Sequence, residues 1–190
     1  MKYPRIFKIL TTPYKMLWAA LYPRHYANLI GVRMKGKVVI YGSSYKVFGS
    51  VPCLVTLGNN VYISLDVRFI CHDGSVLTLR KDFPKLDIIS PIVVGDNVFI
   101  GAGSCILPGV KIGKNCIIGA HAVVTKDVLD NSVVAGNPAK FIKTFEEYKH
   151  QSIKNSTNLG HLTGEKKVKA YKLLFNIILF HHLWSLKKHG

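Results

Sequence analysis

Residues 92–143 read IVVGDNVFIGAGSCILPGVKIGKNCIIGAHAVVTKDVLDNSVVAGNPAKFIK, and a period of six runs through this stretch. An aliphatic residue returns at every sixth position, and a small or β-branched residue follows each of them four positions later. The first set is Val94, Ile100, Ile106, Ile112, Ile118 and Val124, and the second is Val98, Ser104, Val110, Cys116, Ala122 and Val128. A packed helix needs a period of about 3.6 and a half-buried strand a period of about 2, so this repeat predicts short strands joined by tight turns. Stacked coils of such strands form a parallel β-helix in which each coil buries its neighbour's inner face.

A looser array with the same period lies upstream. Its large positions are Val39, Tyr45, Val51, Leu57, Ile63 and Phe69, and its small positions are Ser43, Gly49, Val55, Val61 and Val67. We therefore predict an all-β domain over residues 31–140, a β-helix of about four coils.

The repeat stops between Phe69 and Val94. Residues 73–91 contain charges and two prolines but no period of six, so we predict that they form a loop extruded from the solenoid. Loops on a rigid scaffold are where binding and catalytic residues gather. This loop is therefore expected to carry part of the chemistry.

Residues 1–30 and 141–190 flank the predicted β-helix and are expected to form helical or irregular covers, because a solenoid needs capped ends. Of the formal net charge of +16, residues 1–37 contribute +8 and residues 140–190 contribute +7. Both ends mix these cations with aromatic and aliphatic residues, as in helices that lie in a membrane interface. We expect them either to face an anionic partner, such as a membrane surface or a glycan, or only to cap the solenoid and aid solubility. Nucleic acid is not an expected partner, because no recognised motif accompanies the charge.

The compartment is inferred from what the sequence lacks. The four cysteines form no CxxC pair, no convincing signal peptide precedes the repeat, and the longest apolar stretch, residues 173–180, is too short to cross a bilayer. We expect a cytoplasmic protein, with the inner face of the membrane as a candidate place of attachment.

Two motifs accompany the repeat, VVTKDV at residues 123–128 and AGNPAK at residues 135–140. With them, residues 92–143 resemble the hexapeptide-repeat acyltransferases, and most of all the sugar and polysaccharide O-acetyltransferases. The resemblance implies a left-handed parallel β-helix, a homotrimer with active sites at subunit interfaces, acetyl-CoA as co-substrate, and no metal. It weakens over residues 37–73 and stops at both ends of the chain.

The resemblance also implies where acetyl-CoA binds. The matched positions are small residues beside the pantetheine arm, the VVTK pair, and basic residues near the nucleotide phosphates. A lysine cluster would stabilise those phosphates. The implied cofactor-binding residues are Gly101, Ala102, Ala120, Thr125, Lys126, Lys140 and Lys143.

The family's catalytic base is a histidine in the loop before the final coils, and His72 in FICHDGS stands at that break. A neutral imidazole can take the proton of an acceptor hydroxyl as its oxygen attacks the thioester carbonyl. Asp73 is a candidate to orient the ring, although adjacent residues on a strand point to opposite faces. Backbone N–H groups of Gly101 or Ala102 are candidates to bind the oxyanion.

Two positions depart from the family's pattern. Phe99 stands where the family commonly has Trp, and His121 occupies a turn position usually held by a small residue. His121 either contacts the cofactor or merely tolerates the bend. The acceptor-binding residues of the galactoside and maltose branches find no counterparts.

We expect an O-acetyltransferase acting on a sugar or on a polysaccharide or lipopolysaccharide precursor, with acetylation of serine or of a drug as the alternative. The γ-class carbonic anhydrases share the fold and need three histidines for zinc, whereas the coils here contain His72 and His121 alone. A non-enzymatic scaffold is the remaining alternative, and it predicts that acetyl-CoA does not bind.

Overall fold

The computed structural model describes residues 5–175 and 177, with side chains from residue 12 onward. The chain divides into two compact units, Met1–Tyr148 and Lys149–Gly190. The first unit contains the whole solenoid. The end of the basic C-terminal segment, beyond residue 177, lies outside the described residues.

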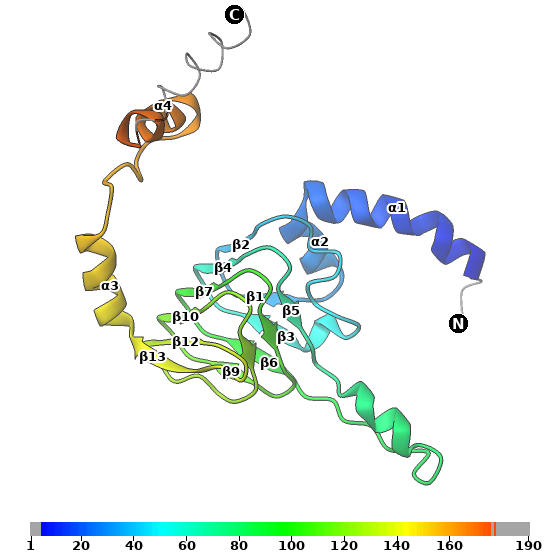
Figure 1. The fold of residues 1–190 in the computed structure, drawn as a ribbon. Helices are drawn as coiled ribbons and strands as arrows, with labels where there is room; N and C mark the ends of the chain where they lie inside the picture. The colour runs from blue at the N-terminus through cyan, green and yellow to red at the C-terminus, as the bar shows by residue number, and fades with distance from the viewer. Residues whose placement is uncertain (1–4, 176, 178–190) are drawn as a thin grey trace, which may run out of the picture. The chain divides into compact units, whose positions relative to one another are not determined.

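The first unit is built mainly of short parallel strands wound into three sheets (Figure 1). The six-stranded sheet has the order β13-β12-β10-β7-β4-β2, the four-stranded sheet β1-β3-β6-β9, and the three-stranded sheet β11-β8-β5. The strands are β1 (Arg33–Met34), β2 (Val38–Ile40), β3 (Val55–Leu57), β4 (Val61–Ile63), β5 (Arg68–Phe69), β6 (Ile92–Val94), β7 (Val98–Ile100), β8 (Cys105–Ile106), β9 (Lys111–Ile112), β10 (Cys116–Ile118), β11 (Val123–Val124), β12 (Ser132–Ala135) and β13 (Lys140–Thr144). Up to β12, consecutive strands belong to different sheets, so the chain travels round the faces of the solenoid as it advances from coil to coil.

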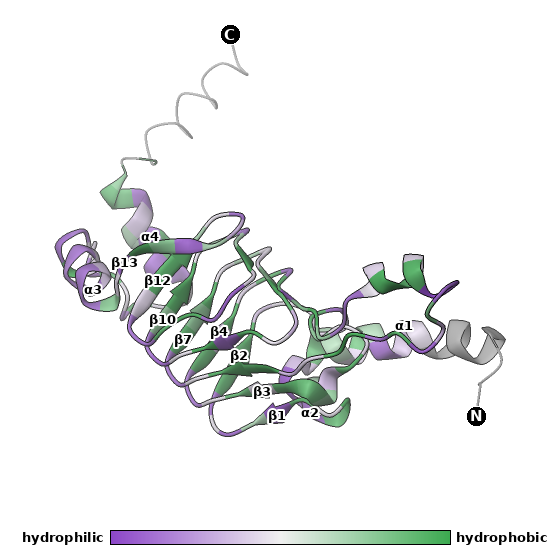
Figure 2. Cartoon of the chain, turned by 90° about the horizontal axis from the view of Figure 1, so that it is seen from below, coloured by the Kyte–Doolittle hydropathy of each residue, from purple (hydrophilic) through white to green (hydrophobic). Residues whose placement is uncertain are grey.

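The interior of the later coils follows the period of six. All twelve residues of the two predicted arrays from Val94 to Val128 are buried, each at most 7% exposed. In the six-stranded sheet Ile100 pairs with Ile118, which stands three hexapeptides further along the chain. This part of the prediction is confirmed. Figure 2 shows the stacked strands β2, β4, β7 and β10 coloured as hydrophobic.

The first coil departs from the predicted phase. Val39, Tyr45 and Val51 are only half-buried, whereas the chain turns Val38 and Ile40 inward. Ile40 pairs with Ile63, so this coil is longer than three hexapeptides. The extra length includes a 3-10 turn, η1 (Pro52–Leu54), and it shifts the coil out of step with the repeat. The predicted inward positions at Val39 and Tyr45 are therefore wrong, as are the small positions at Ser43 and Gly49, which are exposed, whereas the half-buried Val51 does pack against the core.

One corner of the solenoid is formed by a column of asparagines in the left-handed backbone region. Asn60 donates to Asn97 (2.8 Å), Asn97 to Asn115 (2.9 Å) and Asn115 to Asn131 (2.9 Å), each through its side-chain amide. Their φ angles lie between +52° and +57°. Asparagine tolerates this region better than other residues with a side chain, so the column serves both the turn and the stacking of coils.

Helices α1 (Arg5–Leu21) and α2 (Pro23–Leu29) precede the first coil. α2 buries Tyr26 and Ala27, and the Ser44 hydroxyl donates to the Pro23 carbonyl at 2.8 Å. The carbonyl of Ala19 in α1 accepts from the Ser44 amide at 3.2 Å. The start of the solenoid is thus fixed to both helices through one serine.

The C-terminal end of the solenoid is closed by β13, which pairs antiparallel with β12. Helix α3 (Phe145–Lys154) comes directly after it, and α4 (Gly164–Leu174) belongs to the second unit. Glu147 accepts from the amide and hydroxyl of Thr144 (2.7 and 2.9 Å), a capping box that holds the pKa of Glu147 below its ordinary value. No helix within the described residues is long and apolar enough to span a membrane.

Candidate active site

His72 stands at the neck of the extruded loop. The chain leaves the solenoid after β5 and returns at β6, and residues 72 and 89 form an antiparallel bridge. Two further backbone bonds close the neck, from the Asp73 amide to the Ile88 carbonyl and from the Ser90 amide to the Cys71 carbonyl, both at 2.9 Å. Figure 1 shows the loop, with its 3-10 helix η2 (Gly74–Leu79), leaving the solenoid at this point. The backbone of His72 is therefore held on a rigid frame even though a long loop comes after it.

The ring of His72 is half-buried and contacts a serine of the preceding coil. The Oγ of Ser50 lies 3.2 Å from the Nδ1 of His72. Nothing in the periodic pattern singles out Ser50, because it lies in the first coil, where the phase fails. The longer register between the first two coils, seen only in the structure, brings the two side chains together.

Asp73 does not contact the imidazole through a hydrogen bond. Its carboxylate accepts from both the amide (2.9 Å) and the hydroxyl (2.7 Å) of Ser75, and so caps the first turn of η2. These two hydrogen bonds hold the pKa of Asp73 below its ordinary value, with a minor contribution from the nearby His72. The side chain in contact with the imidazole is that of Ser50, not that of Asp73.

Gly101, Ala102 and Ala120 meet at one corner of the solenoid. A side-chain carbon at Gly101 would lie 2.6 Å from the amide nitrogen of Ala120, so only glycine fits there. Ala102 is half-buried and Ala120 is exposed, which leaves a shallow surface of small side chains. The amide of Gly101 donates to the Ile118 carbonyl at 2.8 Å. It is thus used inside the solenoid and is not available to an oxyanion.

His121 lies at the same corner. The presence of a histidine at a turn position where the family usually has a small residue has a local explanation. Its φ is +55°, and its amide donates to the Ala102 carbonyl at 2.7 Å. The ring lies over Gly103, where a side-chain carbon would come within 2.5 Å of it. The exposed imidazole thus occupies the space that Gly103 leaves empty.

Of the lysines that the resemblance assigns to acetyl-CoA, Lys126 lies toward the C-terminal end of the solenoid. Thr125 and Lys126 come directly after β11 and are both exposed. Lys126 lines a cavity of about 260 Å³ together with Ala139 and Phe141, the two neighbours of Lys140. The last matched residue, Lys143, lies further along β13 opposite Val133, near enough to Glu147 to contribute to the lowering of its pKa.

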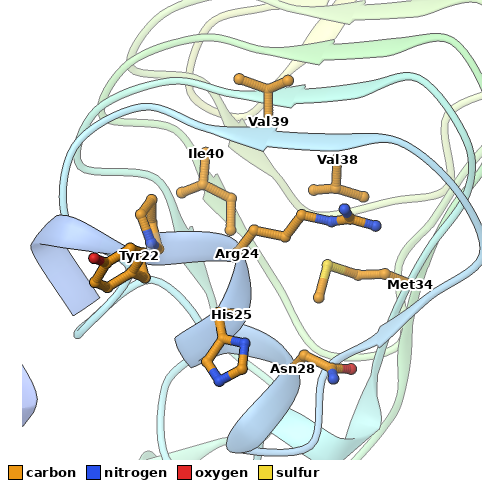
Figure 3. A pocket seen from close by; sticks show the side chains of 9 residues that line it. Tyr22, Arg24, His25, Asn28, Met34, Val38, Val39 and Ile40 are labelled. Atoms are coloured by element: carbon orange, nitrogen blue, oxygen red, sulfur yellow. The ribbon is translucent and has the colours of Figure 1, made fainter. Parts of the chain in front are cut away.

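A second, larger cavity of about 650 Å³ lies between α2 and β2 (Figure 3). Arg24, His25 and Asn28 form its polar side, and residues of β1 and β2 form its apolar side. The guanidinium of Arg24 donates to the Gly36 carbonyl at 3.1 Å. None of its lining residues belongs to the neck of the loop or to the small-residue corner.

No group of three or more His, Cys, Asp or Glu side chains able to hold a metal ion is found in the described part of the chain. The described cysteines are all free thiols, and burial raises the pKa of Cys71, Cys105 and Cys116.

The sequence matches a family model described as "Bacterial transferase hexapeptide (six repeats)" over residues 91–126. A longer match is to Protein CapG of Staphylococcus aureus, with 44% identity over 140 residues, which cover 73% of this chain and 81% of CapG. The galactoside O-acetyltransferase of Escherichia coli is 40% identical over 108 residues, which cover 52% of each chain. The CapG match is therefore far longer than the stretch that the family model matches.

Among solved structures, the fold is similar to that of the hexapeptide-repeat acetyltransferase VCA0836 from Vibrio cholerae. The TM-score is 0.56 at 19% sequence identity, and the match covers 74% of this chain and 91% of the other. At this identity the likeness concerns the fold.

Proposed function

Because this chain belongs to the hexapeptide-repeat acyltransferase family, we propose that it transfers an acetyl group from acetyl-CoA to a hydroxyl of a sugar or of a polysaccharide or lipopolysaccharide precursor. The observation that carries the proposal is the position of His72. This half-buried histidine is fixed at the neck of the one long loop that interrupts the described solenoid. The similarity to a galactoside O-acetyltransferase supports a sugar hydroxyl as the acceptor. The fold is then a left-handed parallel β-helix, as in this family.

In the proposed reaction, Nε2 of His72 takes the proton of the acceptor hydroxyl while the hydroxyl oxygen forms a bond to the thioester carbonyl carbon. The tetrahedral intermediate collapses with cleavage of the carbon–sulfur bond. The CoA thiolate leaves and takes the proton from His72, so the enzyme returns to its starting state. No covalent enzyme intermediate is needed, and the main task of the scaffold is to hold both substrates in line.

Acetyl-CoA is proposed to lie along the corner formed by Gly101, Ala102 and Ala120, where small side chains let the pantetheine arm approach the backbone. Lys126, with Thr125 beside it, stands one hexapeptide beyond Ala120 and would meet the nucleotide phosphates together with Lys140 and Lys143. Of the two amides proposed for the oxyanion, only that of Ala102 is retained, because the Gly101 amide is bonded to Ile118.

The acceptor must reach the imidazole, so we place it beside the loop of residues 73–91 rather than in the cavity next to Arg24. General-base catalysis requires a hydrogen bond between the base and the hydroxyl, directly or through one water. The loop supplies exposed apolar residues at this place, with Leu77 61% and Phe83 62% exposed. The cavity beside Arg24 shares no residue with this region.

We further propose a homotrimer with active sites at the subunit interfaces. The outer face of the six-stranded sheet carries Tyr62, Phe99 and Ile117 side by side in register. Phe99 is 42% exposed. Phe145 and Tyr148 of α3 line a cavity together with this row, and Tyr62 and Ile117 are half-buried. The exposed part of such an apolar row is typical of a surface that another chain covers.

We propose that the protein is cytoplasmic and that its basic N-terminal end attaches it to the inner face of an anionic membrane. In α1 the described side chains of Tyr14, Leu17 and Leu21 are 64%, 59% and 63% exposed, and Lys15 lies among them. Flotation with vesicles containing anionic lipid, but not with neutral vesicles, is the expected result. Failure to float with either kind of vesicle would argue instead that the segment only caps the solenoid, and equal binding to both would contradict the role of the positive charge.

The test of the function is turnover of acetyl-CoA, followed by release of free CoA, with sugars, serine and aminoglycoside or chloramphenicol-type drugs as acceptors. We expect activity with a saccharide and a loss of at least about a hundredfold in kcat for His72→Ala, the usual contribution of a general base. His161→Ala, at an exposed histidine of the second unit, is the matched control and should retain most of the activity. Full activity of the His72 variant would remove the proposed base, and failure to bind acetyl-CoA would favour a scaffold role.

A further inference from the structure

We propose that Ser50 is the positioning residue of the reaction: its hydroxyl oxygen accepts the Nδ1–H of His72 and thereby leaves Nε2 free to act as the base. The inference rests on the proposed function, in which His72 takes the acceptor's proton. Its starting point is the 3.2 Å separation between Ser50 Oγ and His72 Nδ1.

The contact arises from the register of the first two coils. The Arg68 guanidinium donates to the Lys46 carbonyl at 2.9 Å, and the Phe69 amide donates to the Val47 carbonyl at 2.8 Å. Ser50 and His72 stand at the same separation along the chain as the partners in both of these pairs. The Ser50 hydroxyl therefore lies beside the His72 ring because the first coil stacks on the second in this register.

Packing next to Ser50 fixes this register. The ring of Phe48 stacks on that of Phe69 with centroids 5.3 Å apart, and the two residues are 1% and 0% exposed. Gly49 has a φ of +59°, and a side-chain carbon there would lie 2.9 Å from the Phe69 carbonyl oxygen. The chain can thus pass close to Phe69 only as glycine, and it delivers Ser50 to the next position. Both contacts lie directly before Ser50 and hold its backbone, so that the exposed side chain is presented to the ring of His72.

The other candidate partner for Nδ1 is Asp73, whose carboxylate makes no hydrogen bond to the imidazole and bonds Ser75 through Oδ1. No hydrogen bond to Nε2 of His72 comes from the described residues, so this nitrogen is left for a substrate. The backbone of His72 is held by the bonds that close the loop neck.

The chemistry then selects one direction for the Ser50 bond. A histidine that accepts a proton at Nε2 must carry its own proton at Nδ1, and the imidazolium formed in the reaction donates from both nitrogens. Ser50 accepts from Nδ1 before and after the transfer, so it needs no rearrangement. A hydrogen bond to a charged group is stronger than one between neutral groups. The bond from Nδ1 to Ser50 therefore stabilises the imidazolium that forms when His72 takes the acceptor's proton.

The experiment compares Ser50→Ala with Ser50→Thr and with the control Ser43→Ala, an exposed serine of the same segment. For Ser50→Ala we expect kcat to fall about ten- to a hundredfold, as for loss of a hydrogen bond to a charged group. The KM for acetyl-CoA should change less than about twofold, because the serine does not contact the cofactor's path. Ser50→Thr keeps the hydroxyl and should restore most of kcat, and Ser43→Ala should resemble the wild type.

Nitrogen-15 NMR of labelled histidines gives a readout that does not depend on turnover. The wild-type His72 signals, assigned by their absence in His72→Ala, should show protonated Nδ1 and unprotonated Nε2, whereas Ser50→Ala should shift toward a mixture of tautomers. Unchanged kcat and tautomer in Ser50→Ala, with activity still lost in His72→Ala, would overturn the role of Ser50 while leaving the proposed function intact. Full activity of His72→Ala would instead overturn both.

Discussion

The side-chain amide of Asn97 donates to Oδ1 of Asn115 across 2.9 Å, and its own Oδ1 accepts from Asn60 at 2.8 Å. Asn97 is therefore bonded above and below by the same residue type in adjacent coils. Because all three also adopt a positive φ, the residue satisfies the turn conformation and the stacking of coils at the same time.

Asn97→Ala is expected to lower the free energy of unfolding by about 3 kcal/mol. Two half-buried hydrogen bonds contribute about 1 kcal/mol each, and a left-handed conformation costs alanine about 1 kcal/mol. Asn97→Gly removes the bonds but relieves the backbone, so it should lose only about 2 kcal/mol. Urea denaturation measures both, and equal values for the two variants would contradict the conformational part of the argument.

Lys126→Ala should raise the KM for acetyl-CoA about three- to tenfold, with little change in kcat or in Tm. The expected cause is the loss of one cation near the phosphates of CoA, while an exposed lysine contributes little to folding. The matched control is Lys114→Ala, whose side chain is 64% exposed and lies 3.9 Å from Asp130. An equal rise in KM for both variants would mean that only the general positive charge matters.

Phe99→Lys is expected to convert the proposed trimer into monomers, since it places a charge in the centre of the apolar row on the six-stranded sheet. Val93→Lys makes the same change on the four-stranded sheet, where the central residue of β6 is 37% exposed. Light scattering after gel filtration gives the mass of each variant. Dissociation by the Val93 variant alone would move the interface to the other face.

The cap of η2 should be sensitive to acid. The pKa of Asp73 is lower in the folded chain than its ordinary value because Ser75 bonds the carboxylate. The cap therefore stabilises the loop at and above the ordinary pKa of aspartate, about 4, and this contribution is lost as the pH falls through the lower folded value. The protection of the Ser75 amide against exchange should fall in that acidic range, and Asp73→Ala, which has no side-chain acceptor, should show the lower protection already at neutral pH. A wild-type rate that tracks the variant at every pH would show that the carboxylate does not cap the helix.

Most of the solenoid could be predicted from the sequence because its core depends on spacing alone. From Val94 to Val124, each sixth residue must point inward if three hexapeptides close one coil, and all six do. Where the chain adds residues to a coil, spacing no longer determines direction. Val39 and Ile40 differ little in chemistry, and only the pairing of Ile40 with Ile63 decides which of them is buried.

The candidate site shows the same division. His72 is predicted as the base from the family resemblance and from its place before the loop, whereas its contact with Ser50 could not be predicted, because that contact depends on a register between coils that differs from the repeat. Asp73 is the natural local candidate, and its carboxylate is instead used to cap η2. The serine gives no signal of its own in a single sequence, since it lies among the residues where the period is broken.

The closed neck of the loop has a consequence for how enzymes of this design diversify. The loop leaves and re-enters at one place, and Phe69 pairs with Ile106 as if the loop between them were not there. Its length therefore does not enter the stacking of the coils, and the entropic cost of lengthening such a loop rises only slowly. A loop of different length or composition can be exchanged at this neck without moving a strand. If the acceptor binds beside the loop as proposed, acceptor preference can change while the residues proposed to hold the cofactor and to act as the base stay in place.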